Sequence, residues 1–328
     1  MSRMTTLVTG VAGFIGYHTA TRLLARGNTI VGIDSLNDYY SVALKQARLD
    51  QLTKHEGFTF HRFDMAERAA FEAIQSAIKG VVRVIHLAAQ PGVRHSIEHP
   101  FDYVDSNLVA HMTVLELCRH NPEFEHLVYG SSSSVYGANT KLPFSTEDRV
   151  ERPVSLYAAT KLANEHMSYS YAHLYGIPQT GLRFFTVYGP WGRPDMAVYL
   201  FADAIFKGRP IQLFNNGEMR RDFTYIDDIV TGIIAAHDNP PKRTEKPPHR
   251  LYNIGSSEPE PLLRLVGALE NAIGKEARLV MKPLQKGEVL ETYADIAVIK
   301  RALGFKPTIG LDIGIPRFVE WFKSFHKI

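Results

Sequence analysis

A tyrosine and a lysine, Tyr157 and Lys161, stand four positions apart in a segment with a helical pattern. At that spacing both side chains lie on one helix face, a turn apart. A phenol of pKa about 10 is a poor base at neutral pH, but a nearby positive charge favours the phenolate and lowers that pKa. Four serines at 131–134 end a predicted strand before this helix, and a serine hydroxyl there can hold a substrate oxygen during proton transfer.

Each of these signals has a simpler explanation when it is taken alone. A tyrosine and a lysine at this spacing occur by chance in many helices, and serine clusters often only cap turns. The elements around them therefore decide between chemistry and coincidence.

A glycine-rich turn near the start of the chain predicts a phosphate-binding loop. Gly10, Gly13 and Gly16 follow an apolar run that begins at Thr6, and a helical pattern follows at 17–26. Glycine lets the backbone turn sharply and lets a pyrophosphate approach closely. The next helix then presents its free N–H groups and positive dipole end to the anion. A glycine triplet alone is weak evidence, because an ordinary strand–helix–strand unit can carry one.

The second predicted strand, residues 29–33, closes on Asp34, roughly 20 residues beyond the loop. A carboxylate there can accept both hydroxyls of an adenosine ribose. It would also repel a 2′-phosphate, so the pattern favours NAD over NADP. The loop, the strand and the acidic residue together make the dinucleotide interpretation the stronger one.

Further polar or small residues follow the later predicted strands. Asp64 and Met65 end the run 58–63 and are placed to meet an adenine, while the apolar run 81–89 ends in small alanines that leave room for a cofactor. The serine run follows the strand at 124–129. The carboxyl ends of strands are where open α/β sheets bind ligands. We therefore expect an α/β fold, a Rossmann-type doubly wound parallel sheet with a smaller mixed α/β domain.

Composition sets wider limits. The 328 residues are 45% hydrophobic and 22% charged, as in globular proteins. The net charge is +3, and the lysines and arginines are distributed along the sequence and do not form the basic cluster typical of a nucleic-acid-binding protein. No apolar run approaches the length needed to cross a membrane. The single cysteine, Cys118, cannot form an internal disulfide, so a reducing cytoplasm is the expected location.

These residues resemble the extended short-chain dehydrogenase/reductases that epimerise or dehydrate nucleotide sugars. The resemblance covers nearly the whole chain and rests on these features: the glycine loop, Asp34, Asp64, residues 86–89, the serines before 135–137, the Tyr157–Lys161 pair, and residues 182–190 and 221–225. Within that family, residues 34–40, 89–94 and 291–295 are most similar to the UDP-glucuronate 4-epimerases.

The resemblance implies two domains and one reaction. Residues 1–180, with a return segment at about 223–255, would form the NAD-binding Rossmann domain, and residues 181–222 and 256–328 the nucleotide-sugar-binding domain. The implied reaction converts UDP-glucuronate to UDP-galacturonate through a 4-keto sugar, with NAD regenerated in each cycle. The family also implies a homodimer that packs through the helices near 110–118 and 157–174.

The resemblance also assigns roles to residues. Tyr157 would take the C4 hydroxyl proton, Lys161 would lower its pKa and hold the nicotinamide ribose, and Ser132 would lie nearest the sugar O4. The residues expected to bind NAD are Gly10, Gly13, Phe14, Ile15, Gly16, Asp34, Asn37, Lys45, Asp64, Met65, Leu87, Ala88, Ala89, Gln90, Tyr157 and Lys161. Those expected to bind the UDP-sugar are Pro91, Gly92, Arg94, Ser131, Ser132, Ser133, Thr186, Arg193, Arg221 and Glu288, and no metal ion is expected.

Some of these contacts have a physical argument behind them. Arg193 and Arg221 are candidates for the UDP pyrophosphate, because forked guanidinium donors suit phosphate oxygens. Arg94 is placed to face either the sugar carboxylate or solvent. Family members usually have aspartate at Glu288, so its contact with the uridine ribose stays open.

Two other sugar chemistries and one other class remain as alternatives. Sugar 4,6-dehydratases of this family carry an Asp-Glu pair, and UDP-glucuronate decarboxylases a glutamate, where this chain has Ser133 and Ser134. Serine lacks the acid/base function that both chemistries need, so both are disfavoured. UDP-galactose 4-epimerases usually have asparagine at Thr186, so threonine there suits a glucuronate substrate. The rival enzymes that remain are a 4-epimerase of another UDP-hexose, of the UDP-glucose/galactose type, and a UDP-glucuronate decarboxylase. A non-catalytic NAD sensor would be expected to lack the tyrosine–lysine pair.

Overall fold

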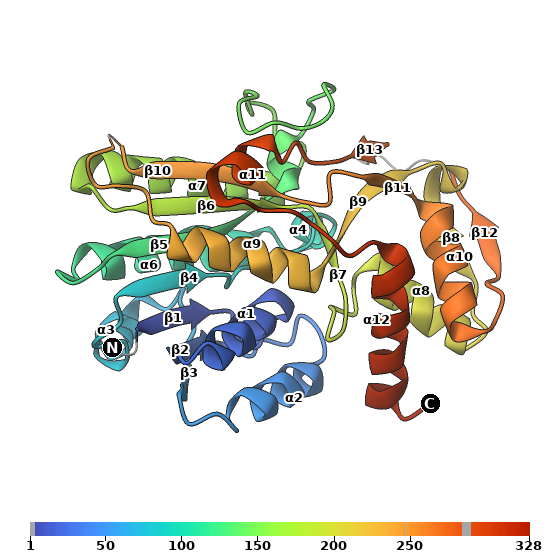
Figure 1. Ribbon diagram of the computed structural model, residues 1–328, viewed down its shortest axis with the longest axis horizontal. Helices are drawn as coiled ribbons and strands as arrows, with labels where there is room; N and C mark the ends of the chain where they lie inside the picture. The colour runs from blue at the N-terminus through green and yellow to red at the C-terminus, as the bar shows by residue number, and fades with distance from the viewer. Residues whose placement is uncertain (1–3, 246, 284–289) are drawn as a thin grey trace.

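The computed structural model describes residues 4–245, 247–283 and 290–328. Its centre is a parallel sheet of seven strands in the order β10-β6-β5-β4-β1-β2-β3 (Figure 1). The strands are β1 (Thr5–Thr9), β2 (Thr29–Asp34), β3 (Phe58–Arg62), β4 (Arg83–His86), β5 (His126–Ser132), β6 (Gln179–Phe184) and β10 (His249–Ile254). The predicted doubly wound parallel sheet is confirmed.

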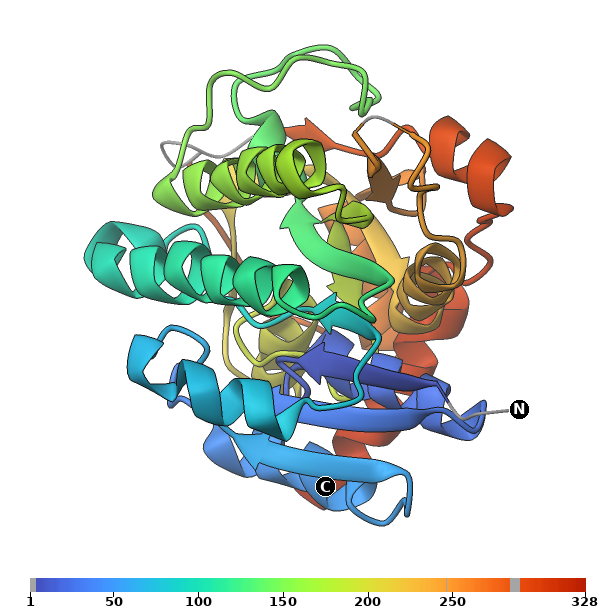
Figure 2. The same cartoon turned by 90° about the vertical axis from the view of Figure 1, so that its left-hand side faces the viewer.

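Helices cover both faces of this sheet, as apolar parallel strands require (Figures 1 and 2). One face carries α1 (Phe14–Ala25), α2 (Val42–Leu52) and α9 (Ile226–Asp238), and the other α3 (Phe71–Ala77), α6 (Ala110–Arg119) and α7 (Leu156–Tyr175). Short segments join them: η1 (Arg68–Ala70), α4 (His95–Glu98), α5 (Pro100–Tyr103), η2 (Val104–Val109) and η3 (Ser133–Tyr136). The strand order reverses between β1 and β4, which opens a crevice at their carboxyl ends.

The remaining elements form a smaller region beside the carboxyl edge of the sheet (Figure 1). Its strands are β7 (Thr186–Tyr188), β8 (Ile211–Leu213), β9 (Arg220–Tyr225), β11 (Pro259–Pro261), β12 (Leu279–Met281) and β13 (Glu291–Thr292). Its helices are α8 (Ala197–Phe206), η4 (Phe214–Gly217), α10 (Leu262–Ile273) and α12 (Leu311–His326). Helix α11 (Ala297–Leu303) packs instead against β10 of the large sheet. Strand β9 is central, because it pairs with β7, β11 and β13.

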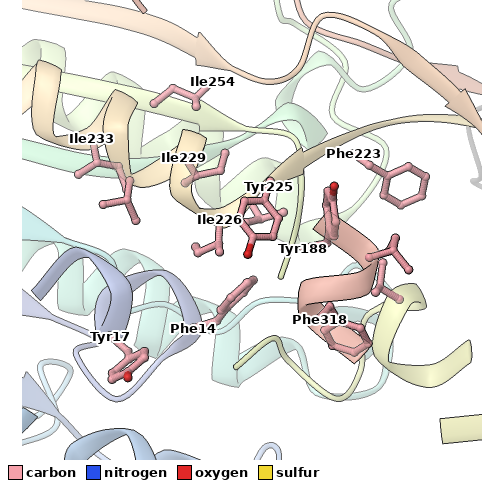
Figure 3. Close-up of a cluster of buried hydrophobic side chains, with 14 of the residues drawn as sticks. Phe14, Tyr17, Tyr188, Phe223, Tyr225, Ile226, Ile229, Ile233, Ile254 and Phe318 are labelled. Atoms are coloured by element: carbon pink, nitrogen blue, oxygen red, sulfur yellow. The ribbon is translucent and has the colours of Figure 1, made fainter. Parts of the chain in front are cut away.

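One continuous apolar core joins the two regions (Figure 3). Phe14 of α1, Tyr225 of β9 and Phe318 of α12 belong to the same buried cluster, together with the apolar face of α9. Burying such a shared face stabilises both regions at once, so the edge of the sheet and the smaller region hold a fixed geometry.

One boundary differs from the sequence prediction. Residue 181 was expected to begin the second domain, yet β6 stays in the large sheet through Phe184, because the apolar run continues past 181 without a turn signal. Asn107 has a side chain typical of a helix start, but it lies inside η2, and Pro100 stands at the start of α5 further upstream. Among the described residues, no helix is both long and apolar enough to cross a membrane.

Candidate active site

A cavity of about 770 Å³ lies at the carboxyl ends of β1, β2, β4 and β5 and reaches the segment after β7. Almost every residue predicted to bind the cofactor or the sugar lines it. The predicted lining residues are Gly10, Gly13, Phe14, Ile15, Gly16, Asp34, Asn37, Lys45, Asp64, Met65, Leu87, Ala88, Ala89, Gln90, Pro91, Gly92, Arg94, Ser131, Ser132, Ser133, Tyr157, Lys161, Thr186 and Arg193.

The glycine turn is packed too tightly for side chains. A Cβ on Gly10, which has φ of +67°, would lie 2.7 Å from the Ala88 nitrogen, and one on Gly16 would lie 2.1 Å from the Gly10 carbonyl oxygen. Helix α1 follows from Gly13 with no side-chain cap. Its first N–H groups therefore have no partner within the helix and are available to an anion in the cavity.

Asp34 stands at the end of β2 on the same cavity wall. Its carboxylate accepts hydrogen bonds from the backbone N–H groups of Ala12, at 3.0 Å, and Leu36, at 2.9 Å. Burial raises the pKa of this carboxyl, and those hydrogen bonds and the charge of Lys45 oppose the shift. Lys45 donates to the backbone and side-chain oxygens of Asn37, both at 2.6 Å. The glycine turn and this acidic end suit a dinucleotide with an unphosphorylated ribose.

Tyr157 and Lys161 lie on the first turns of α7, which Ser155 caps by accepting from the N–H of Ala158 at 3.1 Å. Lys161 donates to the Gly130 carbonyl oxygen at 3.0 Å. Burial raises the pKa of the Tyr157 phenol, whereas a hydrogen bond with Ser132 and the charge of Arg193 lower it.

Two basic side chains, Lys161 and Arg193, lie at this corner of the cavity. Burial lowers the pKa of Lys161 to about 8, against the opposing charge of Glu165. Arg193, which was predicted only as a pyrophosphate ligand, is the cation that lowers the Tyr157 pKa in this structure. The Lys161 ammonium instead ties the helix to the end of β5.

The serines of the predicted site do not all face the same partner. Ser132 accepts from the backbone N–H of Ser134 at 3.2 Å and donates to the Ser134 hydroxyl at 3.1 Å. Ser133 lines the cavity at the start of η3. Ser131 also borders the cavity, but it donates its hydroxyl hydrogen to Glu165 at 2.6 Å. A carboxylate only accepts, so this bond uses the single hydrogen of the Ser131 hydroxyl, and Ser131 cannot also donate to a substrate in this geometry. The Ser132 partner is a hydroxyl, which can itself become the donor and leave the Ser132 hydrogen to a substrate.

Sequence reasoning missed a cluster that closes one side of the cavity. Arg193 pairs with Asp195, at 3.0 Å from Nε and 2.5 Å from Nη2, and the Tyr39 hydroxyl donates to the same carboxylate at 3.1 Å. Tyr39 also lies against the loop 90–94, because a Cβ on Gly92 would meet its hydroxyl oxygen at 2.7 Å. The arginine–acid spacing at 193–195 was a local signal, whereas nothing near Tyr39 in the sequence pointed to Asp195.

The other predicted sugar contacts differ in position. Arg94 lines the cavity and also lies 5.1 Å over the Phe214 ring. Arg221 lies on β9, is not among the described residues that line the cavity, and donates to the carbonyl oxygens of Arg220 and Leu290. Its pyrophosphate contact stays a prediction. Glu288 lies outside the residues that the structure describes.

The described residues include one group with metal-ligand chemistry, His95, His99 and Asp102, whose ligating atoms lie within 4.8 Å of one another. His99 and Asp102 are exposed, and nothing else in the structure points to an ion there. That the protein binds no metal ion stays a prediction.

A doubly wound sheet with a glycine turn, an acidic second strand end and a Ser–Tyr–Lys set at its carboxyl edge defines the short-chain dehydrogenase/reductase class. The chain belongs to the NAD dependent epimerase/dehydratase family, whose pattern matches residues 6–255.

Named relatives are similar along the whole chain. Protein CapI of Staphylococcus aureus is 46% identical over 99% of this chain and 100% of its own length. UDP-glucuronate 4-epimerase 4 of Arabidopsis thaliana is 44% identical over 99% of this chain and 76% of its own length. The crystal structure of a UDP-glucuronic acid 4-epimerase from Bacillus cereus, in complex with UDP-glucuronic acid and NAD, matches with a TM-score of 0.89 and 34% identity, covering 98% of this chain and 100% of that one.

Proposed function

We propose that this protein is an NAD-dependent UDP-glucuronate 4-epimerase that interconverts UDP-glucuronate and UDP-galacturonate. The observation that carries the proposal is the placement of Tyr157, Lys161 and Ser132 on the wall of one cavity with the glycine turn, which brings a base and a hydroxyl group to the cofactor site. The similarity to enzymes named for this activity supports it.

The chain's residues perform the acid–base part. The Tyr157 phenolate accepts the proton of the C4 hydroxyl as that carbon is oxidised, and the resulting phenol returns a proton when the 4-keto sugar is reduced. Ser132 holds O4 through both steps. Arg193 favours the phenolate, which matters because burial alone would raise the Tyr157 pKa. Lys161 holds the helix that carries Tyr157 against the end of β5 and would hold the nicotinamide ribose.

The residues present fit NAD. The uncapped start of α1 would hold the pyrophosphate, and Asp34 would accept the adenosine ribose hydroxyls. Asp64 and Met65 would border the adenine, with Met65 buried behind it. When bound, NAD supplies the redox chemistry, accepting hydride from C4 and returning it to the opposite face of the sugar.

Neutral donors favour a substrate that keeps its carboxylate. Ser133, Ser134 and Thr186 border the cavity, and none of them can shuttle a proton at C5 or C6 as an aspartate or glutamate would. Their hydroxyls can hydrogen-bond a carboxylate instead. This set favours epimerisation over dehydration or decarboxylation of the same sugar.

We also propose the wider assignments that the family resemblance implies. The large sheet with its helices would bind NAD, and the smaller region would bind the UDP-sugar. Helices α6 and α7 lie side by side on one face (Figure 2) and carry partly exposed Met112 and Tyr169, which supports a homodimer through that face. The single, buried Cys118 supports a cytoplasmic location.

The test uses the protein as purified, with no added cofactor, incubated with UDP-glucuronate and separately with UDP-glucose while proton NMR follows the anomeric signals. We expect UDP-galacturonate from UDP-glucuronate and no conversion of UDP-glucose. Turnover of UDP-glucose alone would keep the mechanism and overturn the substrate. A UDP-pentose as the main product would identify a decarboxylase.

A further inference from the structure

A buried ion pair lies beside the serine run. Glu165 of α7 accepts hydrogen bonds from the Arg183 guanidinium of β6, at 2.9 Å from Nε and 2.7 Å from Nη2. Their side chains are 3% and 2% exposed, respectively. A buried bidentate pair holds its partners in one geometry, because displacing either partner leaves a charge without compensation.

Ser131 is the third member of this cluster. Its hydroxyl donates to Glu165 at 2.6 Å, and Ser131 is the direct partner of Arg183 in the parallel pairing of β5 with β6. Adjacent partners in a sheet present their side chains to the same face, here the face that α7 covers. Glu165 thus fastens the catalytic helix to two neighbouring strands at once.

The cluster stands next to the reacting groups. Tyr157, Lys161 and Glu165 follow one another at successive turns of α7, so they share one side of the helix. Lys161 donates to the carbonyl oxygen of Gly130, which immediately precedes Ser131. Two tethers, Lys161 to Gly130 and Glu165 to Ser131, therefore connect α7 to the end of β5. Ser132 comes directly after them and lines the same cavity as Tyr157.

We propose that Glu165 is a positioning residue: by holding Ser131 and Arg183 together, it sets the placement of Ser132 against Tyr157. Ser131 then acts inside the protein and not on the sugar. The inference rests on the proposed function, because the positioned pair is the one that transfers the C4 proton. Arg183 in turn stacks 4.8 Å from the Tyr136 ring, which anchors the far side of the cluster.

The cluster should influence the titration of Tyr157 through Ser132. The Ser132 hydrogen bond lowers the Tyr157 pKa, so a displaced serine strand would leave that pKa higher. The charged and titratable groups facing Tyr157 and Lys161 are Arg193 after β7, Tyr103 of α5, Glu165 of α7, His86 of β4 and His111 of α6. Burial lowers the pKa of both histidines, so they stay neutral and do not mask the effect.

The experiment compares Ser131→Ala with Ser168→Ala. Ser168 is the control, because it is a fully buried serine of α7, the helix that carries Glu165, and its hydroxyl bonds His111 at 2.8 Å. For Ser131→Ala we expect kcat with UDP-glucuronate to fall about 10- to 100-fold, with KM unchanged. Ser168→Ala should keep the wild-type kcat within about twofold. A raised KM with an intact kcat in Ser131→Ala would mean that Ser131 binds the sugar, and the proposal would fail.

A second variant addresses the ion pair itself. Glu165→Leu alone would leave Arg183 buried without a counter-charge, so the double variant Glu165→Leu/Arg183→Met removes both charges and keeps an apolar core. We expect it to fold and to lose kcat as Ser131→Ala does. A folded double variant with wild-type kcat would overturn the proposal.

A readout without substrate separates this inference from the proposed function. Ultraviolet titration of the NAD-loaded protein, minus the same titration of its Tyr157→Phe counterpart, reports the Tyr157 phenolate. We expect the Tyr157 pKa to rise in Ser131→Ala and to stay at its wild-type value in Ser168→Ala. If wild-type protein does not convert UDP-glucuronate, the proposed function fails and this titration still decides the positioning role. An unshifted pKa in Ser131→Ala would refute it.

Discussion

Replacing Gly16 by alanine should remove NAD from the protein, because the glycine turn has no room for one methyl group. The new Cβ would lie 2.1 Å from the Gly10 oxygen, 2.8 Å from the Gly10 carbonyl carbon and 3.0 Å from the Val11 Cα. All three are backbone atoms, so relief requires the turn itself to open by roughly 1 Å, at a cost of about 1–3 kcal/mol in stability.

The larger effect falls on the cofactor. Opening the turn moves the first N–H groups of α1 away from the pyrophosphate position, and each lost hydrogen bond to a charged group is worth about 1.5–3 kcal/mol. Two such bonds correspond to an affinity loss of roughly 10²–10⁴-fold. The assay measures NAD content per purified chain, the dissociation constant for added NAD, and urea unfolding of the cofactor-stripped protein.

The matched control is Gly267→Ala. Gly267 lies inside α10 with nothing within 4 Å of its added Cβ, so alanine there should leave NAD unchanged and stabilise the helix by about 0.5–1 kcal/mol. A Gly16→Ala protein that keeps wild-type NAD content and affinity would refute the phosphate-binding role of this turn.

Four further outcomes are expected. Tyr157→Phe should abolish epimerisation and leave NAD bound; measurable turnover near the wild-type rate would remove the tyrosine from the role of base. Ser132→Ala should lower kcat by ~10²–10⁴-fold, and an unchanged rate would shift the O4 contact to another hydroxyl. Asp34→Ala should weaken NAD retention, checked by cofactor content after dialysis, and equal retention would contradict the ribose contact. The buried Lys161 has a pKa of about 8, below the value of about 10.5 expected in the unfolded chain. Below pH 8 this lysine is charged in the folded and in the unfolded chain, and burying its charge lowers the stability of the folded protein. Between those pH values the unfolded chain binds more protons, and wild-type stability should rise relative to Lys161→Met by up to roughly 3 kcal/mol; parallel pH profiles in urea unfolding would contradict the low pKa.

The cofactor half of the site could be predicted from sequence because its signals are local. Gly10, Gly13 and Gly16 fall within one turn, and Asp34 ends the next strand, so neighbouring residues carried both the structure and the chemistry. The Tyr157–Lys161 spacing was local in the same sense, since helix periodicity alone aligns the two side chains. Asn107 shows the limit of such reasoning. Its side chain has helix-capping chemistry, yet in the fold it bonds Gln90 and Thr160 from distant segments.

The sugar half could be predicted only as a set of candidates, because long-range pairing decides which way each side chain points. The sequence shows four adjacent serines, but only the register of β5 against β6 places Ser131 beside Arg183 and thereby opposite Glu165. The same holds for Tyr39, which meets Asp195 across 156 positions of sequence. A residue that contacts the ligand and a residue that only holds the surrounding backbone in place can therefore be of the same type and adjacent in the chain. It follows that substitutions at Ser131 and at Ser133 should have different consequences: a change at Ser131 should act on the rate of proton transfer for any sugar, while a change at Ser133 should act on the selection of the C5 carboxylate.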